Sequence, residues 1–208
     1  MARSDTSIAN RAIDIVGGLT ITSLNDNSKA ARALKRAYTP VLEDLLFKHN
    51  WSFAIARAEL SVAGSGPLYE YDTAFNLPLD YVRLIEIYPK YLKHKREGDK
   101  ILADAASLKI KYIRQVTNPN EFTPEFAELF AKALAAQVCY KITQSRALEA
   151  DKKQEFKEYY MWATSNDSKQ AGTPEKFADD VWMAARGYGN DTDENAIVDE
   201  NFNYGSVS

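Results

Sequence analysis

The sequence is poor in the residues that build covalent cross-links and metal centres. Its 208 residues include one cysteine, Cys139, and two histidines, His49 and His94. A single cysteine excludes an intrachain disulfide and favours a reducing compartment. Neither histidine has a nearby cysteine or an HExxH spacing, so we expect capping or surface histidines and no zinc site. Cys139 is expected to be a small buried residue and not a nucleophile.

Long apolar runs and glycine-rich motifs are also missing. No apolar run approaches roughly 18 residues, so no membrane-spanning segment is expected, and the N-terminus lacks the continuous apolar stretch of a signal peptide. The glycines at positions 64, 66 and 98 match neither a dinucleotide-binding fingerprint nor a phosphate-binding loop, and there is no GxSxG motif. We therefore expect no cofactor, no metal ligands and no catalytic residues.

Charge is unevenly distributed along the chain. The formal net charge is −3, but residues 187–208 carry five acidic side chains and no basic ones, which leaves about +2 on the rest. Neither value resembles the strongly basic balance of a protein that wraps nucleic acid. The acidic tail can bury little apolar surface, so we expect it to be disordered or to order on a partner.

Both ends of the chain carry apolar residues at helical spacing. The first helix should end at Gly17-Gly18, and Pro40 should kink the second helix or divide it in two. Thr123 and Pro124 suit the cap and first turn of a third helix, which is nearly apolar all round and should be buried on several sides. Four helices are thus predicted, over residues 5–16, 28–50, 123–147 and 150–170.

The middle of the chain changes to the two-residue alternation typical of strands. The alternation begins at Trp51, where large apolar residues alternate with small alanines that would allow a close approach to a neighbouring element. A second clear strand is predicted over 81–89. Further strands are predicted within 91–116, joined by turns at 97–99 and 104–107, and the last of them should have one wet face.

Together these segments predict an α+β fold. We expect a mainly α-helical bundle of about four main helices, with an inserted antiparallel β-sheet or hairpin region and an extended C-terminal arm. Trp51 would lie at the junction of bundle and sheet, as the first residue of the strand that leaves the second helix. The bundle should comprise residues 1–50 and 120–172, the inserted β region residues 51–119, and the arm with its acidic tail residues 173–208.

Two pairs of carboxylates keep an enzymatic hypothesis open. Glu97 and Asp99 flank a turn glycine, and Glu70 and Asp72 lie in an extended segment. A glycoside hydrolase places two carboxylates about 5–9.5 Å apart across a cleft. A sequence with 29 acidic residues also offers such pairs by chance.

Basic residues that interleave with tyrosines keep a nucleic-acid-binding hypothesis open. They lie in the predicted strands at 90–96 and 109–114. Positive strands with aromatic side chains can form a stacking surface for single strands. A solvated sheet face is the more common origin of this pattern, and the acidic isoelectric point of about 5.5 argues against nucleic-acid binding.

The order of aromatic, proline and small residues is more specific than any single motif. It consists of Trp51-Ser52-Phe53-Ala54, Arg57-Ala58, Leu60, Tyr69, Tyr71, Leu77-Pro78, Asp80, Arg83, Tyr91, Tyr112-Ile113, Val116-Thr117-Asn118-Pro119, Phe122, Pro124, Phe126, Ile142-Thr143-Gln144-Ser145, Val181-Trp182 and Ala185-Arg186. In this order the chain resembles the tail tubular protein A, or head-to-tail adaptor (connector), family of short-tailed bacteriophages, from about residue 5 to Arg186. The segment 61–68 is short, and the acidic tail after Gly187 carries no motif that can be assigned.

The resemblance implies a structural protein of the virion tail or neck, assembled in the bacterial cytoplasm, without enzymatic activity. Members of the family form a homo-oligomeric ring, a dodecamer, beneath the portal protein. The ring extends the DNA channel without binding the genome specifically. Below it lie the tail nozzle, a tubular protein B-like partner, or needle and fibre proteins.

Eight residues are predicted to contribute to the structure or the interfaces of such a ring. A docking arm is expected over 177–186, anchored by one aromatic and one charged side chain. Some relatives are also reported to hydrolyse peptidoglycan, so a muralytic tail protein is the alternative, and a nucleic-acid-binding module is a further one. The eight residues are Trp51, Phe53, Arg57, Tyr69, Tyr71, Phe177, Trp182 and Arg186.

Overall fold

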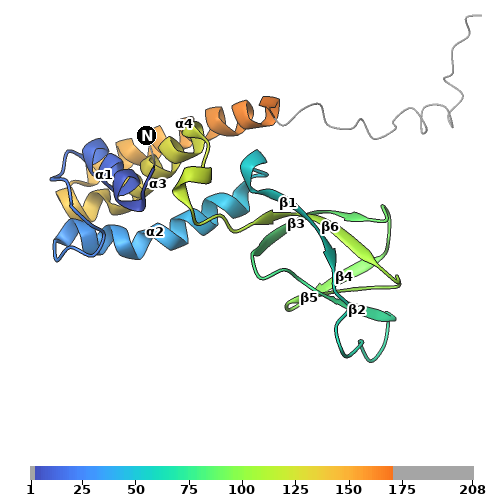
Figure 1. The fold of residues 1–208 in the computed structure, drawn as a ribbon. Helices are drawn as coiled ribbons and strands as arrows, with labels where there is room; N and C mark the ends of the chain where they lie inside the picture. The colour runs from blue at the N-terminus through green and yellow to red at the C-terminus, as the bar shows by residue number, and fades with distance from the viewer. Residues whose placement is uncertain (1–2, 171–208) are drawn as a thin grey trace, which may run out of the picture. The chain divides into compact units, whose positions relative to one another are not determined.

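The computed structural model describes residues 3–170, which belong to a compact unit spanning Met1–Gly172. The fold is α+β, as predicted: helices from both ends of this unit pack together, and the segment between them forms two small antiparallel sheets (Figure 1). The arm and acidic tail expected over 173–208 lie outside the described residues. The elements are α1 (Asp5–Val16), α2 (Lys29–Lys48), a short 3-10 helix η1 (Ser52–Ala54), β1 (Ile55–Leu60), β2 (Thr73–Asn76), β3 (Tyr81–Tyr88), β4 (His94–Glu97), β5 (Lys100–Ala103), β6 (Leu108–Arg114), a short 3-10 helix η2 (Pro119–Glu121), α3 (Pro124–Thr143) and α4 (Arg146–Gln170).

Local capping signals define the ends of the helices. Ser4 and Ser7 form a capping box at the start of α1, in which the amide of each residue donates to the hydroxyl oxygen of the other at 2.9 and 3.1 Å. Gly17 ends α1 with a left-handed φ of 74°. Thr123 caps α3 and Pro124 takes its first position. The predicted start and end of α1 and the predicted start of α3 are therefore confirmed.

Of the two outcomes predicted at Pro40, a kink or a division of the helix, the division is wrong, because α2 is one continuous helix. Pro40 lies on its exposed face, where the carbonyl that loses its helical partner can be hydrated. Buried Tyr38 holds this part of α2 against α3, since its ring meets that of Phe130 edge-on with centroids 4.8 Å apart. Tertiary packing thus offsets the local cost of the proline.

The predicted boundary between the last two helices is also wrong. The helix expected over 123–147 ends at Thr143, and α4 begins at Arg146. Gln144 takes a left-handed φ of 59° between them, and its amide donates to the carbonyl of Tyr140 at 2.9 Å. A non-glycine residue at such a φ is hard to foresee from sequence, because glycine normally fills the position.

The central helix of the bundle is α3, against which α1, α2 and α4 all pack (Figure 1). Half of its residues are buried, among them Cys139, which is fully buried as predicted. Its alanines allow the neighbouring helices to approach closely. Lys132 is its main polar link to α4: the ammonium bonds Glu155, to which Lys152 also donates at 2.8 Å. These two hydrogen bonds lower the pKa of the Glu155 carboxyl.

The β part consists of two three-stranded antiparallel sheets with strand orders β1-β6-β3 and β2-β5-β4. A second core lies between them, distinct from the core of the bundle. The β4–β5 hairpin turns at Gly98-Asp99, and Gly98 supplies the positive φ of 59° that such a two-residue turn requires. The largest buried side chains of this second core include Phe75, Ile101 and Leu108.

The strand predicted to begin at Trp51 begins only at Ile55. Ser52–Ala54 forms a turn of 3-10 helix, closed by the amide of Ala54 donating to the carbonyl of Trp51 at 3.0 Å. The alternation therefore has two origins, because Trp51 and Ala54 are buried by the turn, whereas the alanines of β1 pack against the β core. An alternation of period two over so short a stretch does not show whether a residue is buried by a turn or by a strand.

The β1-β6-β3 sheet contacts both cores, because successive residues of a strand point to opposite faces. On β6, Leu108 and Ile110 belong to the β core, whereas Ile113 is fully buried in the core of the bundle. Lys109 and Lys111 share the face of Ile113 and are exposed or partly exposed, so the predicted wet face is confirmed.

We predict that Ile113→Ala lowers the free energy of unfolding by about 2–5 kcal/mol, because it leaves a cavity where sheet and bundle share a core. Urea denaturation followed by circular dichroism measures the loss. Leu79→Ala is the control and should change stability by less than about 0.5 kcal/mol, since Leu79 is fully solvent-exposed. An Ile113 variant as stable as this control would contradict the shared core.

Candidate functional site

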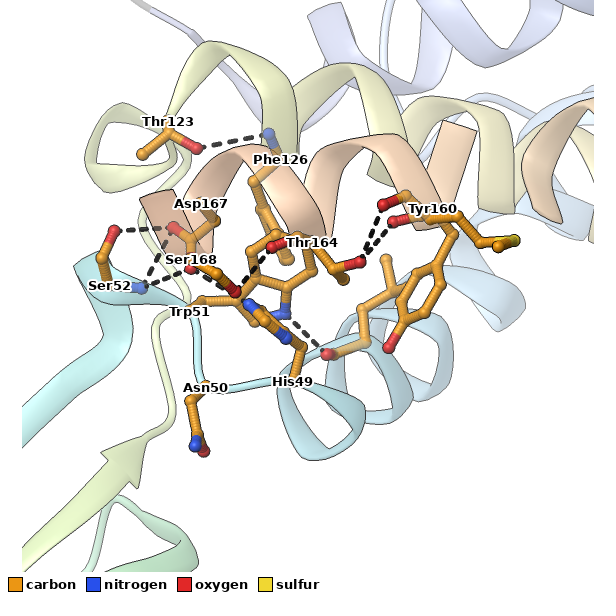
Figure 2. A network of polar contacts seen from close by, with 12 residues as sticks. His49, Asn50, Trp51, Ser52, Thr123, Phe126, Tyr160, Thr164, Asp167 and Ser168 are labelled. Atoms are coloured by element: carbon orange, nitrogen blue, oxygen red, sulfur yellow. Dashed lines mark hydrogen bonds and ion pairs between the residues drawn. The ribbon is translucent and has the colours of Figure 1, made fainter. Parts of the chain in front are cut away.

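A buried carboxylate connects α4 to the segment that joins α2 to β1 (Figure 2). Asp167 accepts hydrogen bonds from the Ser52 hydroxyl at 2.7 Å and from the Ser52 amide at 3.2 Å. Its Oδ2 also lies 3.1 Å from Nε2 of His49, the C-cap residue of α2. Asp167 is 7% exposed, and it is the one buried charged residue among residues 3–170. We call His49, Ser52 and Asp167 the Asp167 clamp.

Trp51 lies within the clamp segment and is fully buried, at the predicted junction of bundle and β part. Its Nε1 donates to the carbonyl of Leu45 at 2.8 Å, which satisfies one of the free carbonyls in the last turn of α2. Its ring meets those of His49 and Phe126 edge-on, with centroids 4.6 and 4.9 Å apart. Packing and hydrogen bonding therefore both hold residues 49–52, which lead from α2 toward β1.

A second set of contacts joins α2 to the sheet. Arg83 of β3 donates from Nη2 to Oδ1 of Asn50 at 2.5 Å, and its guanidinium lies over the ring of Phe47, 5.9 Å from the centroid. Gln115, just after β6, donates from Nε2 to Oε1 of Glu43 at 3.2 Å. The end of α2 is thus held from two sides, by α4 and by the sheet.

The clamp contains the residue types of a hydrolytic triad but not its geometry. In a triad the histidine stands between serine and aspartate, so that it can take the serine proton. Here the hydroxyl of Ser52 donates directly to Asp167, and His49 contacts the same carboxylate. The carboxylate occupies the middle position, so this arrangement stabilises a connection and does not activate the serine.

Two buried tyrosines form similar links to carboxylates. Tyr38 donates to Oδ1 of Asp5 at 2.9 Å, and Tyr112 donates to Oδ1 of Asp80 at 3.0 Å. Burial raises the pKa of both Tyr38 and Tyr112, and the neighbouring carboxylate raises each further. Both hydroxyls therefore remain protonated donors at neutral pH.

The predicted interface residues lie in different environments. Trp51 and Tyr71 are buried and Phe53 is partly buried, while Arg57 and Tyr69 are exposed. The rings of Trp51 and Phe53 are neighbours, with centroids 6.5 Å apart. The remaining candidates, Phe177, Trp182 and Arg186, lie outside the described residues.

Two neighbouring loops of the β part expose large side chains. Tyr69, with 76% of its surface exposed, lies in the loop before β2, and Tyr91, with 89%, lies in the loop before β4. Lys93 lies over the ring of Tyr71 at 5.7 Å from the centroid, which joins the two loops. Glu70 and Tyr91 take positive φ values of 70° and 68°, a conformation that non-glycine residues adopt only at a cost.

The carboxylates considered for glycoside hydrolysis are engaged at the surface. Lys95 lies 3.1 Å from Glu97 and 3.6 Å from Glu70, and all three side chains are more than half exposed. The hydrogen bond that Lys95 donates to Glu97 and the charge of Glu70 raise the pKa of Lys95. The amide of Asp72 donates to the carboxylate of Asp104 at 2.9 Å. Lys95, Glu70 and Glu97 thus form a charged surface patch.

Of the two basic strands predicted for nucleic-acid binding, 109–114 lies in β6, whereas the one predicted over 90–96 begins only at His94, in β4 of the other sheet. Lys109 of β6 lies 3.9 Å from Glu59, and Lys90 lies 3.4 Å from Glu86. Cations and carboxylates therefore alternate on the outer face of the β1-β6-β3 sheet. His94 is exposed in β4, as predicted, and His49 serves as a C-cap.

No group of three or more histidine, cysteine, aspartate or glutamate side chains in residues 3–170 is placed to hold a metal ion. In the same part of the chain, no helix has the length and apolar character to cross a membrane. A scan against protein-family models finds no family that matches the chain, and a search of curated proteins finds no match either.

Local sequence patterns do not single out Asp167, although it is the centre of the clamp. One signal was available: a carboxylate in the last turn of a helix is disfavoured by the helix dipole, so its presence there suggests a specific partner. The partner itself, Ser52, lies 115 residues away and could not be inferred from local pattern.

We predict that Asp167→Ala lowers the free energy of unfolding by about 2–3 kcal/mol, because it leaves the Ser52 donors without their charged acceptor. Chemical denaturation measures the change. Ser165→Ala is the matched control, since Ser165 is exposed on the same helix and should be nearly neutral. Equal stability of the two variants would show that the clamp contributes nothing.

Proposed function

We propose that the protein is a structural virion protein, a subunit of a phage head-to-tail adaptor ring. The ring connects the portal protein above to the tail nozzle below and extends the DNA channel between them. In this role the chain is not an enzyme. It is assembled in the host cytoplasm and resides in the neck of the virion.

The observation that carries the proposal is the position of the residues in which the chain resembles this family. Trp51 and Ser52 build the connection between bundle and β part. Phe53 packs against Phe122 and Phe126, with ring centroids 5.8 and 4.8 Å apart. Five residues of the pattern, Trp51, Ser52, Phe53, Phe122 and Phe126, therefore support one joint. A ring subunit needs such a joint, because copies close a ring only when each presents its two surfaces in the same relation.

Exposed aromatic residues on both parts suit contacts with different partners. Trp162 of α4 is 52% exposed, beside the exposed Met161, and Tyr69 and Tyr91 project from the loops of the β part. Tyrosine and tryptophan are enriched where proteins meet. The bundle and the β part each offer a surface of this kind, as a subunit between portal and nozzle requires.

The modest net charge of −3 also suits a DNA channel. A lining that bound phosphates tightly would hold the genome in place, whereas a weakly charged lining lets it pass.

The proposed function predicts that the chain joins a portal as a ring of many copies. Purified chain is mixed with the portal protein of the same phage, and the mass of the complex is measured by native mass spectrometry. We expect about twelve copies per portal ring, in line with closed cyclic symmetry. Absence of any complex, together with clearing of cell-wall suspensions by the chain alone, would favour the muralytic alternative.

We further predict that deletion of residues 173–208 abolishes attachment to the portal, because it removes the expected docking arm at 177–186. The double variant Trp182→Ala and Arg186→Ala should weaken attachment in the same direction, and Glu175→Ala serves as control. Circular dichroism should show the helices of the truncated chain intact. Full portal binding by the truncated chain would disprove the arm.

A further inference from the structure

The outer face of the β1-β6-β3 sheet carries a groove with a volume of about 430 Å³. Its charged side chains come from all three strands and from the residues just after β3. Strand pairing arranges them in two rows across the sheet, and each row places one residue of β6 between one of β1 and one of β3. The groove belongs to neither the clamp nor the exposed loops.

The first row brings like charges together. Arg57 of β1 pairs directly with Lys111 of β6, and Glu86 of β3 lies on the other side of Lys111. Like charges placed opposite each other on one face of a sheet are destabilising. Glu86 does not neutralise Lys111, because its carboxylate pairs with Lys90, with Oε1 and Nζ 3.4 Å apart. Within residues 3–170, neither Arg57 nor Lys111 forms an ion pair.

The second row adds a cation and an apolar surface. Lys109 of β6 lies between Glu59 of β1 and Tyr88 of β3. The Lys109–Glu59 distance of 3.9 Å is long, and both side chains are more than half exposed, so this pair contributes little. The side chain of Tyr88 is 62% exposed. The groove thus offers a positive pair beside an exposed aromatic ring.

The chain itself contains a segment with the complementary pattern. Residues 193–200 read DENAIVDE, so that two acidic residues precede and two follow the apolar run Ala196-Ile197-Val198. Such a segment can place carboxylates on a positive pair while its aliphatic side chains cover an aromatic ring. The whole stretch 187–208 contains no basic residue that would oppose this contact.

We propose that the groove binds residues 193–200 of a second copy of this chain. In this contact, carboxylates of the second copy neutralise Arg57 and Lys111, and Ile197 or Val198 packs on Tyr88. Groove and tail are different surfaces, so each copy can donate its tail to one neighbour and accept a tail from another. This head-to-tail association concerns the chain alone and does not depend on its proposed place in a virion.

The test begins with sedimentation of the full-length chain over a range of concentrations. We expect reversible self-association that weakens as salt rises, because the contact joins exposed charges. Arg57→Gln with Lys111→Gln should weaken it about tenfold or more, without loss of fold, since the variant removes a repulsion. Arg36→Gln with Lys157→Gln is the matched control: both residues are exposed on helices, and this variant should associate like the unaltered chain.

A tail variant tests the other half of the contact. Replacement of the four acidic residues of 193–200 by their amides should weaken association as much as the groove variant does. A mixture of the two variants tests whether the contact joins two different copies of the chain. The intact tail of one and the intact groove of the other can form a single contact, so the mixture should form dimers and stop there.

Several outcomes would overturn the proposal. One is a full-length chain that stays monomeric at every concentration, and another is a groove variant that associates normally. If the mixture of the two variants forms no dimers, a contact between copies is excluded. If a short DNA duplex binds the unaltered chain and the groove variant loses that binding while its self-association is unchanged, the groove is a nucleic-acid surface instead.

Discussion

The described fold depends on one buried carboxylate that receives its hydrogen bonds from a distant part of the chain. A buried charge is costly unless it is fully hydrogen-bonded. Asp167 meets this condition through the amide and hydroxyl of Ser52 and the ring of His49. The same contacts fix the only covalent route from α2 into β1. α4 is thereby connected to the start of the β part, and the direction in which β1 leaves the bundle is set.

The β1-β6-β3 sheet, which contacts both cores, adds a second constraint on the position of the β part. β6 contributes Ile113 to the core of the bundle and Ile110 to the core between the sheets. Because the pleat alternates, neither contact can be lost without disturbing the register that supports the other. The bundle and the β part therefore belong to one compact unit. A protein that works by holding partners in a fixed relation benefits from this arrangement, since a loose joint would give each copy a different geometry.

The residues that carry the resemblance lie both in the interior and on the surface of the protein. Trp51, Tyr71 and Phe126 are buried, and they specify how the chain is built. The exposed candidates are Tyr69 and Tyr91 on the loops, Trp162 on α4 and the cation pair of the groove. This division is typical of a scaffold whose interior is constrained by packing, while its surface is free to match particular partners.

The sequence by itself determined the features that arise from local interactions. The α+β class, the bounds of α1, the cap of α3, the hairpin at Gly98 and the wet face of β6 follow from capping residues, glycine positions and hydrophobic period. Tertiary structure alone decided that α2 continues through Pro40, that Trp51 begins a turn and not a strand, and that Asp167 meets Ser52. Each of these depends on residues far away in the chain, whose packing outweighs local propensity and leaves no trace in a short window of sequence.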